Sequence, residues 1–332
     1  MRSQRRLYRP QAQIVQNPFV FKIDTRNIAT GSSNSFSFRL PLNNNPTESA
    51  LTAYDFTINW GDGDSNYINT WDDASLLHTY ATEGIREISI NGKLTSIYFN
   101  YGTERLKIIS IEDFGSVNLQ ANQSNAFNRC YNLASLPATG NLDFITNGHF
   151  MFSSCSFPNF PNIDLPNLVN GNQMFYQNYD LLGVPSNMRL HNLEDGSNMF
   201  YGIRNSSLPE GMTLGKLING DAMFRAGIGN ATLPSTLTFA SLQISTRMYL
   251  GPKVLNIPNS ISLPSLTNGL NMFYSSTLPT VDYSNLLIRM NNENPNSNVS
   301  FHAGASKYNS SASSARAALV SRGWTITDGG LI

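Results

Sequence analysis

The residues of this chain with the clearest capacity for chemistry are the oxygen-bearing side chains of the stretch "GDGDSNYINTWDD". A hard cation such as Ca²⁺ needs several oxygen ligands, so this stretch is a candidate calcium loop with Asp62, Asp64 and Asp72 as carboxylate ligands. Asn66 and Asp73 add further oxygens. The spacing lacks the bidentate glutamate that closes a typical calcium loop. A plain turn is the alternative, and we expect no cofactor.

Catalytic constellations are not evident elsewhere. No phosphate-binding or dinucleotide fingerprint occurs, and the histidines lie in unrelated contexts: His78, His149, His191 and His302. Residues 120–283 consist of sequence repeats, which are described below. Two carboxylates that face each other across neighbouring repeats could cleave a glycan, but the acidic residues do not recur at equivalent positions of successive repeats. These acids are Asp164, Asp180, Glu194, Asp195 and Glu210. We therefore predict that the protein is not an enzyme and has no catalytic or cofactor-binding residues.

Composition and the distribution of apolar residues argue against a nucleic-acid binder, a membrane-spanning protein and a protein with a secretory signal peptide. Charged residues make up 13% of the 332 residues and the net charge is zero, which argues against a nucleic-acid binder. No apolar run is long enough to span a membrane, and none follows the first arginines as in a secretory signal peptide. Residues 1–17 are nevertheless basic, through Arg2, Arg5, Arg6 and Arg9. They are either a frayed tail or an anchoring arm that orders against a larger partner.

Those candidate residues must be positioned by the rest of the chain, and half of it repeats. The hexapeptides "NGHFMF", "NGNQMF", "NGDAMF" and "NGLNMF" end in aromatic residues that recur every 23 to 25 residues. The full aromatic series is Phe127, Phe152, Phe175, Phe200, Phe224, Tyr249 and Phe273. An apolar-proline pair recurs with the same period, from Leu136-Pro137 to Ile257-Pro258. Two markers with one period predict a solenoid.

Each part of the repeat has a physical interpretation. Asn-Gly tolerates positive φ and would turn the chain. The Met-Phe pair would pack inside each coil and build a continuous aromatic ladder. We favour this core-packing role over a ligand- or cofactor-binding motif. The Tyr249 coil has Ile244-Ser245 in place of Asn-Gly, so we expect it to be the least regular. Cys130 and Cys155 occupy equivalent positions in neighbouring coils. We expect buried reduced thiols there, with a disulfide as the alternative.

The repeats resemble a known family. The coils "MFSSCSFPNFPNIDLPNLVNGNQMF" and "NMFYGIRNSSLPEGMTLGKLINGDAMF" look like BspA-type leucine-rich repeats, and the resemblance covers residues 120–283. That family occurs in bacterial surface proteins and in many bacteriophage structural proteins. This chain departs from it mildly, because the third residue after the aromatic is cysteine only twice and the usual tryptophan-containing strand is absent.

The segments on either side of the repeats predict other elements. Residues 18–115 alternate apolar and polar side chains in "FVFKI", "SFSFRLPL", "YDFTINW" and "REISI", a β-sandwich pattern. "WGDG", "HTY" and Gly84 resemble a PKD-like domain, which implies a binding or spacer module. After a polar loop, "SASSARAALVSRG" predicts a helix that stops at Gly323, and "WTITDGG" predicts a strand. This ending closely resembles the ends of repeat proteins in phage genomes.

Together these features predict a mainly β chain. We expect a basic arm (1–17), a PKD-like β-sandwich (18–115), a leucine-rich-repeat solenoid of about seven coils (116–290) and a helix-strand cap (291–332). The expected function is a bacteriophage virion surface protein, either a capsid decoration or a tail or head appendage, assembled in the host cytoplasm. Its expected partners are other virion proteins and a host surface glycan or protein, with several copies or a homo-oligomer in the assembly. The alternative is a bacterial cell-surface adhesin.

Overall fold

The fold was analysed in a computed structural model. It describes residues 17–43, 54–100, 102–117, 119–137, 140–158, 163–181, 183–184, 188–203, 208–226, 231–251 and 255–332. The predicted anchoring arm, with Arg2, Arg5, Arg6 and Arg9, lies outside these residues except for Asn17.

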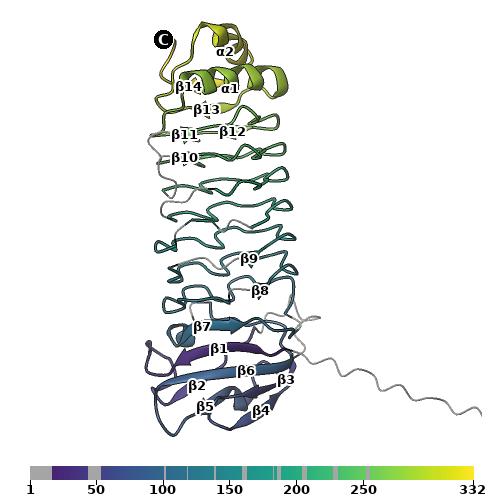
Figure 1. The fold of residues 1–332 in the computed structure, drawn as a ribbon, viewed down its shortest axis with the longest axis vertical. Coiled ribbons are helices and arrows are strands. Elements are labelled where there is room, and N and C mark those ends of the chain that lie inside the picture. Colours follow the sequence, from purple (N-terminus) through teal and green to yellow (C-terminus); the bar gives the residue numbers. More distant parts are fainter. Residues whose placement is uncertain are drawn as a thin grey trace, which may run out of the picture.

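The N-terminal unit is built on one five-stranded antiparallel sheet with the order β4-β3-β6-β1-β7, and β2 pairs separately with β5 (Figure 1). Its strands are β1 (Phe19–Asp24), β2 (Ser37–Arg39), β3 (Asp55–Asn59), β4 (Ser65–Ile68), β5 (Leu77–Thr79), β6 (Ile85–Lys93) and β7 (Ile108–Asp113). Two 3₁₀ turns, η2 (Ala74–Leu76) and η3 (Thr103–Leu106), connect them. Alternate residues of β1 and β3 are buried, as the period of a strand with one core face requires.

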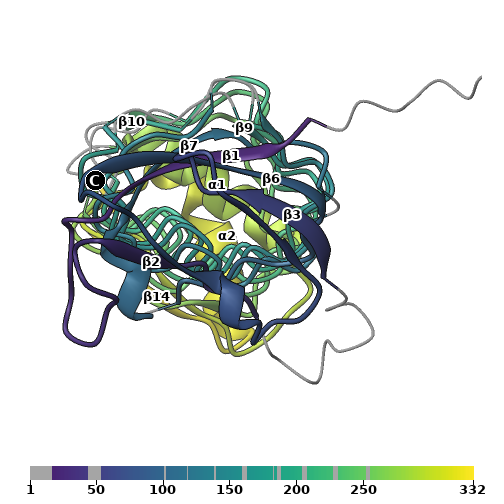
Figure 2. The same ribbon diagram turned by 90° about the horizontal axis from the view of Figure 1, so that it is seen from below.

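The repeated segments lie one above another between this unit and the C-terminus (Figure 1). We call the described residues between 119 and 277 the repeat stack. Single parallel bridges join the equivalent residues of successive repeats: Asn122, Asn147, Asn170, Asp195, Asn219, Ile244 and Asn268. The other strands here have two residues each: β8 (Gly140–Asn141), β9 (Ile163–Asp164), β10 (Ala231–Thr232), β11 (Leu255–Asn256) and β12 (Asn268–Gly269). Seen along the stack, the successive repeats superimpose (Figure 2).

Backbone conformation explains why these strands are so short. In every repeat the residues two before and two after the marker aromatic have positive φ. The first set is Asn125, Phe150, Gln173, Asn198, Ala222, Arg247 and Asn271. The second set is Arg129, Ser154, Gln177, Gly202, Ala226, Gly251 and Ser275. Left-handed residues four apart turn the chain repeatedly, so an extended ladder cannot continue past the bridge.

The predicted fold class is therefore wrong. Strands account for 21% and helices for 12% of the residues that the structure describes, and the sheets are small. The described residues do not form the predicted leucine-rich-repeat solenoid of about seven coils; the repeats are stacked turns with bridges of one or two residues. The predicted sandwich is likewise a five-stranded sheet with a two-stranded one. The periodic spacing was read correctly from the sequence, but spacing does not reveal positive φ at non-glycine residues.

The role predicted for Asn-Gly also needs correction. The glycines of these pairs do not have positive φ. A Cβ on Gly148 would lie 2.8 Å from the Sδ of Met174, and one on Gly171 would lie 2.9 Å from the Sδ of Met199. Glycine is present because the methionine of the following repeat occupies that space. The asparagine makes the turn instead, since its Oδ1 accepts the N–H two residues on, as Asn170 does from Asn172 at 3.0 Å.

The C-terminal cap begins earlier than predicted. The helix α1 (Thr280–Glu293) begins within the predicted solenoid (116–290) and ends just beyond it. It is followed by β13 (Ser300–His302), η4 (Ser310–Ala312), α2 (Ser313–Ser321) and β14 (Thr325–Thr327). Strands β12, β13 and β14 form a parallel sheet that continues the stack. α2 and β14 occupy the stretches predicted to be helix and strand. Among the described residues, no helix is long and apolar enough to cross a membrane.

Candidate functional site

The marker aromatics form one continuous column of stacked rings. Successive centroids from Phe127 to Phe273 are 5.4 to 5.9 Å apart, and the planes diverge by 3 to 16°. All of these rings are buried. The column extends beyond the predicted markers, because Phe99 stacks on Phe127 at 5.9 Å and Phe301 of β13 closes the other end edge-on. These residues are a core, and a ligand has no access to them.

Backbone hydrogen bonds run through the stack in one register. The N–H of each marker aromatic before Phe273 donates to the carbonyl of the methionine in the following repeat, as Phe152 does to Met174 at 3.0 Å and Phe200 to Met223 at 3.0 Å. The N–H of Phe273 donates to the His302 carbonyl in β13 at 3.0 Å. The Tyr249 repeat follows the same rule, with its N–H 2.9 Å from the Met272 carbonyl. The prediction that this repeat would be the least regular therefore fails at the ring and its backbone hydrogen bond, but at Gly251 the φ is +132°, against +55° to +83° at the equivalent residues of the other repeats. The bridge and hydrogen bonds need only backbone atoms, so Ile244-Ser245 can supply them.

The predicted calcium ligands separate in the structure. Asp62 and Asp64 lie on the turn between β3 and β4, and they are joined there by His78 from β5. The Nε2 of His78 is 2.7 Å from Oδ2 of Asp62. Asp72 is not part of this group, and the carboxylate of Asp73 accepts the Ser75 N–H at the start of η2. The histidine was not recognised as a partner because it is 16 residues away in sequence and lies on β5, which pairs with β2 in a different sheet from β3 and β4.

Two opposing effects act on the pKa of Asp62 in the group of Asp62, Asp64 and His78. Partial burial of Asp62 acts to raise its pKa, but hydrogen bonds from His78 and the Asp64 N–H outweigh it and lower the pKa. The His78 ring stacks on Trp60 with centroids 4.9 Å apart and planes 6° apart, and Tyr80 meets it edge-on. Among the described residues, this is the one group of three or more side chains that could hold a metal ion.

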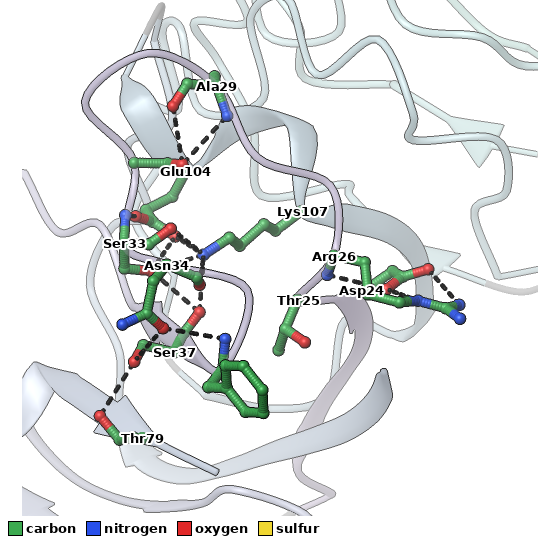
Figure 3. Close-up of polar contacts among 12 residues, drawn as sticks. Asp24, Thr25, Arg26, Ala29, Ser33, Asn34, Ser37, Thr79, Glu104 and Lys107 are labelled. Carbon is green, nitrogen blue, oxygen red and sulfur yellow. Dashed lines mark hydrogen bonds and ion pairs between the residues drawn. The ribbon is translucent and has the colours of Figure 1, made fainter. Parts of the chain in front are cut away.

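A second polar cluster is buried in the N-terminal unit (Figure 3). Lys107 is fully buried, and its Nζ donates to the carbonyls of Ser33, Asn34 and Ser37 at 2.7 to 3.0 Å. Glu104 lies 3.2 Å from the same Nζ and accepts the Ser33 N–H. Burial lowers the pKa of Lys107. Every donor of the ammonium group has a partner, so this cluster fixes the loop before β2 and leaves no group free to react.

One side of the repeat stack carries exposed tyrosines around a hollow. Tyr131 and Tyr179, two repeats apart, are 43% and 45% exposed and line a hollow of about 280 Å³. Arg129, Gln177 and Asp180 contribute polar groups to its wall. Aromatic faces beside planar polar side chains are typical of binding surfaces. This hollow is therefore the part of the stack best suited to contact a partner.

The remaining candidates have structural roles. Cys130 and Cys155 are free and buried, and burial raises the pKa of both thiols. Asp164 pairs with Arg189 from the next repeat, and Asp195 accepts the Ser197 N–H at 2.9 Å.

Comparisons with known proteins identify no relative. No family model matches the chain, and neither a curated protein nor a solved structure is detectably similar to it. The function must therefore be inferred from the molecule itself.

Proposed function

We propose that this chain is a non-enzymatic surface protein of a bacteriophage particle. In this proposal the N-terminal region anchors the chain to other virion proteins. The repeat stack then projects outward, to stabilise the particle surface or to attach to a host surface.

The observation that carries the proposal is the unbroken column of rings from Phe99 to Phe301. Together with the register of hydrogen bonds between repeats, it makes an elongated body whose two ends differ. Stacked repeats hold their neighbours at fixed spacing and resist bending better than a flexible linker does. Such a body is suited to holding one surface at a set distance from another.

The anchoring arm joins this body at a defined place. Asn17 accepts a hydrogen bond from the Ser116 N–H at 2.9 Å, beside the start of the repeat stack. The basic residues of the arm would meet an acidic surface on a capsid or tail protein.

Deletion of residues 1–16 tests the anchor and retains Asn17. We expect the deleted chain to remain folded by circular dichroism but to be lost from particles purified on a density gradient. The matched control replaces Arg2, Arg5, Arg6 and Arg9 with lysine, which keeps the charge and should keep incorporation. Undiminished incorporation of the deleted chain would contradict the anchoring role.

A bacterial cell-surface adhesin is the second candidate, and the tyrosine-lined hollow favours it. An adhesin requires such a hollow for contact with a glycan or protein, whereas a virion protein that only stabilises the particle surface does not. The two functions also differ in where the protein resides, because an adhesin would fractionate with the cell envelope and a virion protein with the particles.

A further inference from the structure

We propose that Asp62, Asp64 and His78 form a binding site for a first-row divalent transition-metal ion such as Zn²⁺ or Co²⁺. One ligand atom from each of these three side chains lies within 4.8 Å of the other two. At Zn–N and Zn–O bond lengths near 2.1 Å, tetrahedral ligands are about 3.4 Å apart. Small side-chain rotations therefore suffice to bring the three atoms onto one ion.

The chemistry of the ligands selects the kind of ion. Calcium takes six to eight oxygen ligands, whereas this group offers two carboxylates and one imidazole nitrogen. An imidazole with carboxylates suits borderline first-row ions such as Zn²⁺ and Co²⁺. Asp72, which a calcium loop would need, is outside the group.

The negative charge of the two carboxylates is an independent reason to expect a cation at this site. One oxygen of Asp62 has His78 as its hydrogen-bond partner, at 2.7 Å. The carboxylate of Asp64 makes no hydrogen bond or ion pair within the described part of the chain. Two carboxylates this close together repel each other, and a divalent cation between them would relieve that repulsion.

The ligands are held in place before any ion binds. Trp60 and Tyr80 are buried and fix the His78 ring from its face and its edge. The turn that carries both aspartates is held by Gly61, where φ is +84° and a Cβ would lie 2.3 Å from the Glu87 carbonyl oxygen. A rigid scaffold behind the ligands lowers the cost of assembling the site.

The site also has room for water ligands. A surface hollow of about 450 Å³ opens beside Asp64 and His78, and Asn66 and Ser75 also line it. Water from this hollow can complete the coordination shell. A bound ion would join the β3–β4 turn to β5, which belong to different sheets of the N-terminal unit.

The proposal is tested by metal binding to the full-length, untagged chain, from which any bound metal has first been removed with a chelator. Zn²⁺ is titrated by calorimetry, Co²⁺ by its visible absorption, and thermal unfolding is followed with and without Zn²⁺. We expect one ion per chain and a higher Tm with Zn²⁺, because an ion that binds only the folded state stabilises it. Asp64→Asn should weaken binding at least tenfold and abolish the rise in Tm.

Asp64→Asn is the principal variant because its side chain is exposed and unbonded, so the fold should survive. His78→Gln should also lose binding, but it removes a ring that packs on Trp60. Asp72→Asn is the matched control and should bind Zn²⁺ as the parent chain does. Absence of Zn²⁺ and Co²⁺ binding, or undiminished binding by Asp64→Asn, would overturn the proposal. Binding of Ca²⁺ that Asp72→Asn abolishes would also overturn it, in favour of a calcium loop.

Discussion

At the scale of single residues, the repeat stack depends on which side chain stands at each repeated position. Six of the seven markers are phenylalanine, and the exception is Tyr249. Its ring stacks like the others, but its hydroxyl is buried and has no hydrogen-bond partner among the residues that the structure describes. A buried hydroxyl without a partner costs free energy relative to the same group in water.

Tyr249→Phe should therefore stabilise the protein. We expect the free energy of unfolding at pH 7 to rise by about 1 kcal/mol, measured by urea denaturation. Burial raises the pKa of Tyr249 above the ordinary value near 10. The folded state thus keeps a proton that the unfolded chain loses, so stability present below pH 10 declines above it. The variant should show a shallower decline than the parent chain, and an identical alkaline profile would contradict this.

Glycine at the repeated Asn-Gly position makes a second residue-scale prediction. Gly171→Ala should lower the free energy of unfolding by about 1 to 3 kcal/mol, because the new Cβ meets Met199 and two leucines within 3.1 Å. Gly215→Ala is the control, since its nearest neighbour is 3.6 Å away and its φ is not positive. It should be neutral or slightly stabilising. Equal losses for both variants would show that steric contact with methionine is not the reason for glycine.

At the scale of elements, the ring column should carry much of the stability of the stack. Phe224→Ala removes a fully buried ring between Phe200 and Tyr249. We expect a loss of about 3 to 5 kcal/mol in the free energy of unfolding, measured by denaturant titration. Tyr274→Ala is the control, because that ring is 49% exposed beside the column and should cost less than about 1 kcal/mol. A loss below about 1 kcal/mol for Phe224→Ala would mean that the ring is not in a packed core.

The elements also show what the sequence could and could not predict. The seven recurring aromatic residues, six of them preceded by Met, predicted the positions of the seven rings, because periodic apolar residues must share a core. The first ring of the column, Phe99, was missed because its segment lacks the Asn-Gly pair and lies 28 residues before Phe127. Helix α1 was missed because the 24-residue period was extended over it, although Tyr283, Leu286, Leu287 and Met290 are buried at helical spacing. The position of His78 beside Asp62 depends on contact between two different sheets, which spacing along the chain does not give.

At the scale of the whole molecule, the N-terminal unit, the repeat stack and the cap follow one another along a single axis (Figure 1). The hydrogen bonds of β12, β13 and β14 continue the stack into the cap, and Phe99 carries the ring column into the N-terminal unit. The three parts therefore share one continuous core. A body of this kind transmits load from the region near Asn17 to the far end, which is the property that the proposed role on a particle surface requires.

The measurement that tests this role most directly is quantitative mass spectrometry of purified phage particles from cells that produce the protein naturally. We predict that the chain is present in a fixed copy number per particle. Hundreds of copies would identify a capsid decoration, and a few to a few dozen would identify a tail or vertex appendage. Absence of the chain from the particles, with recovery in the cell envelope, would contradict the account and favour the adhesin.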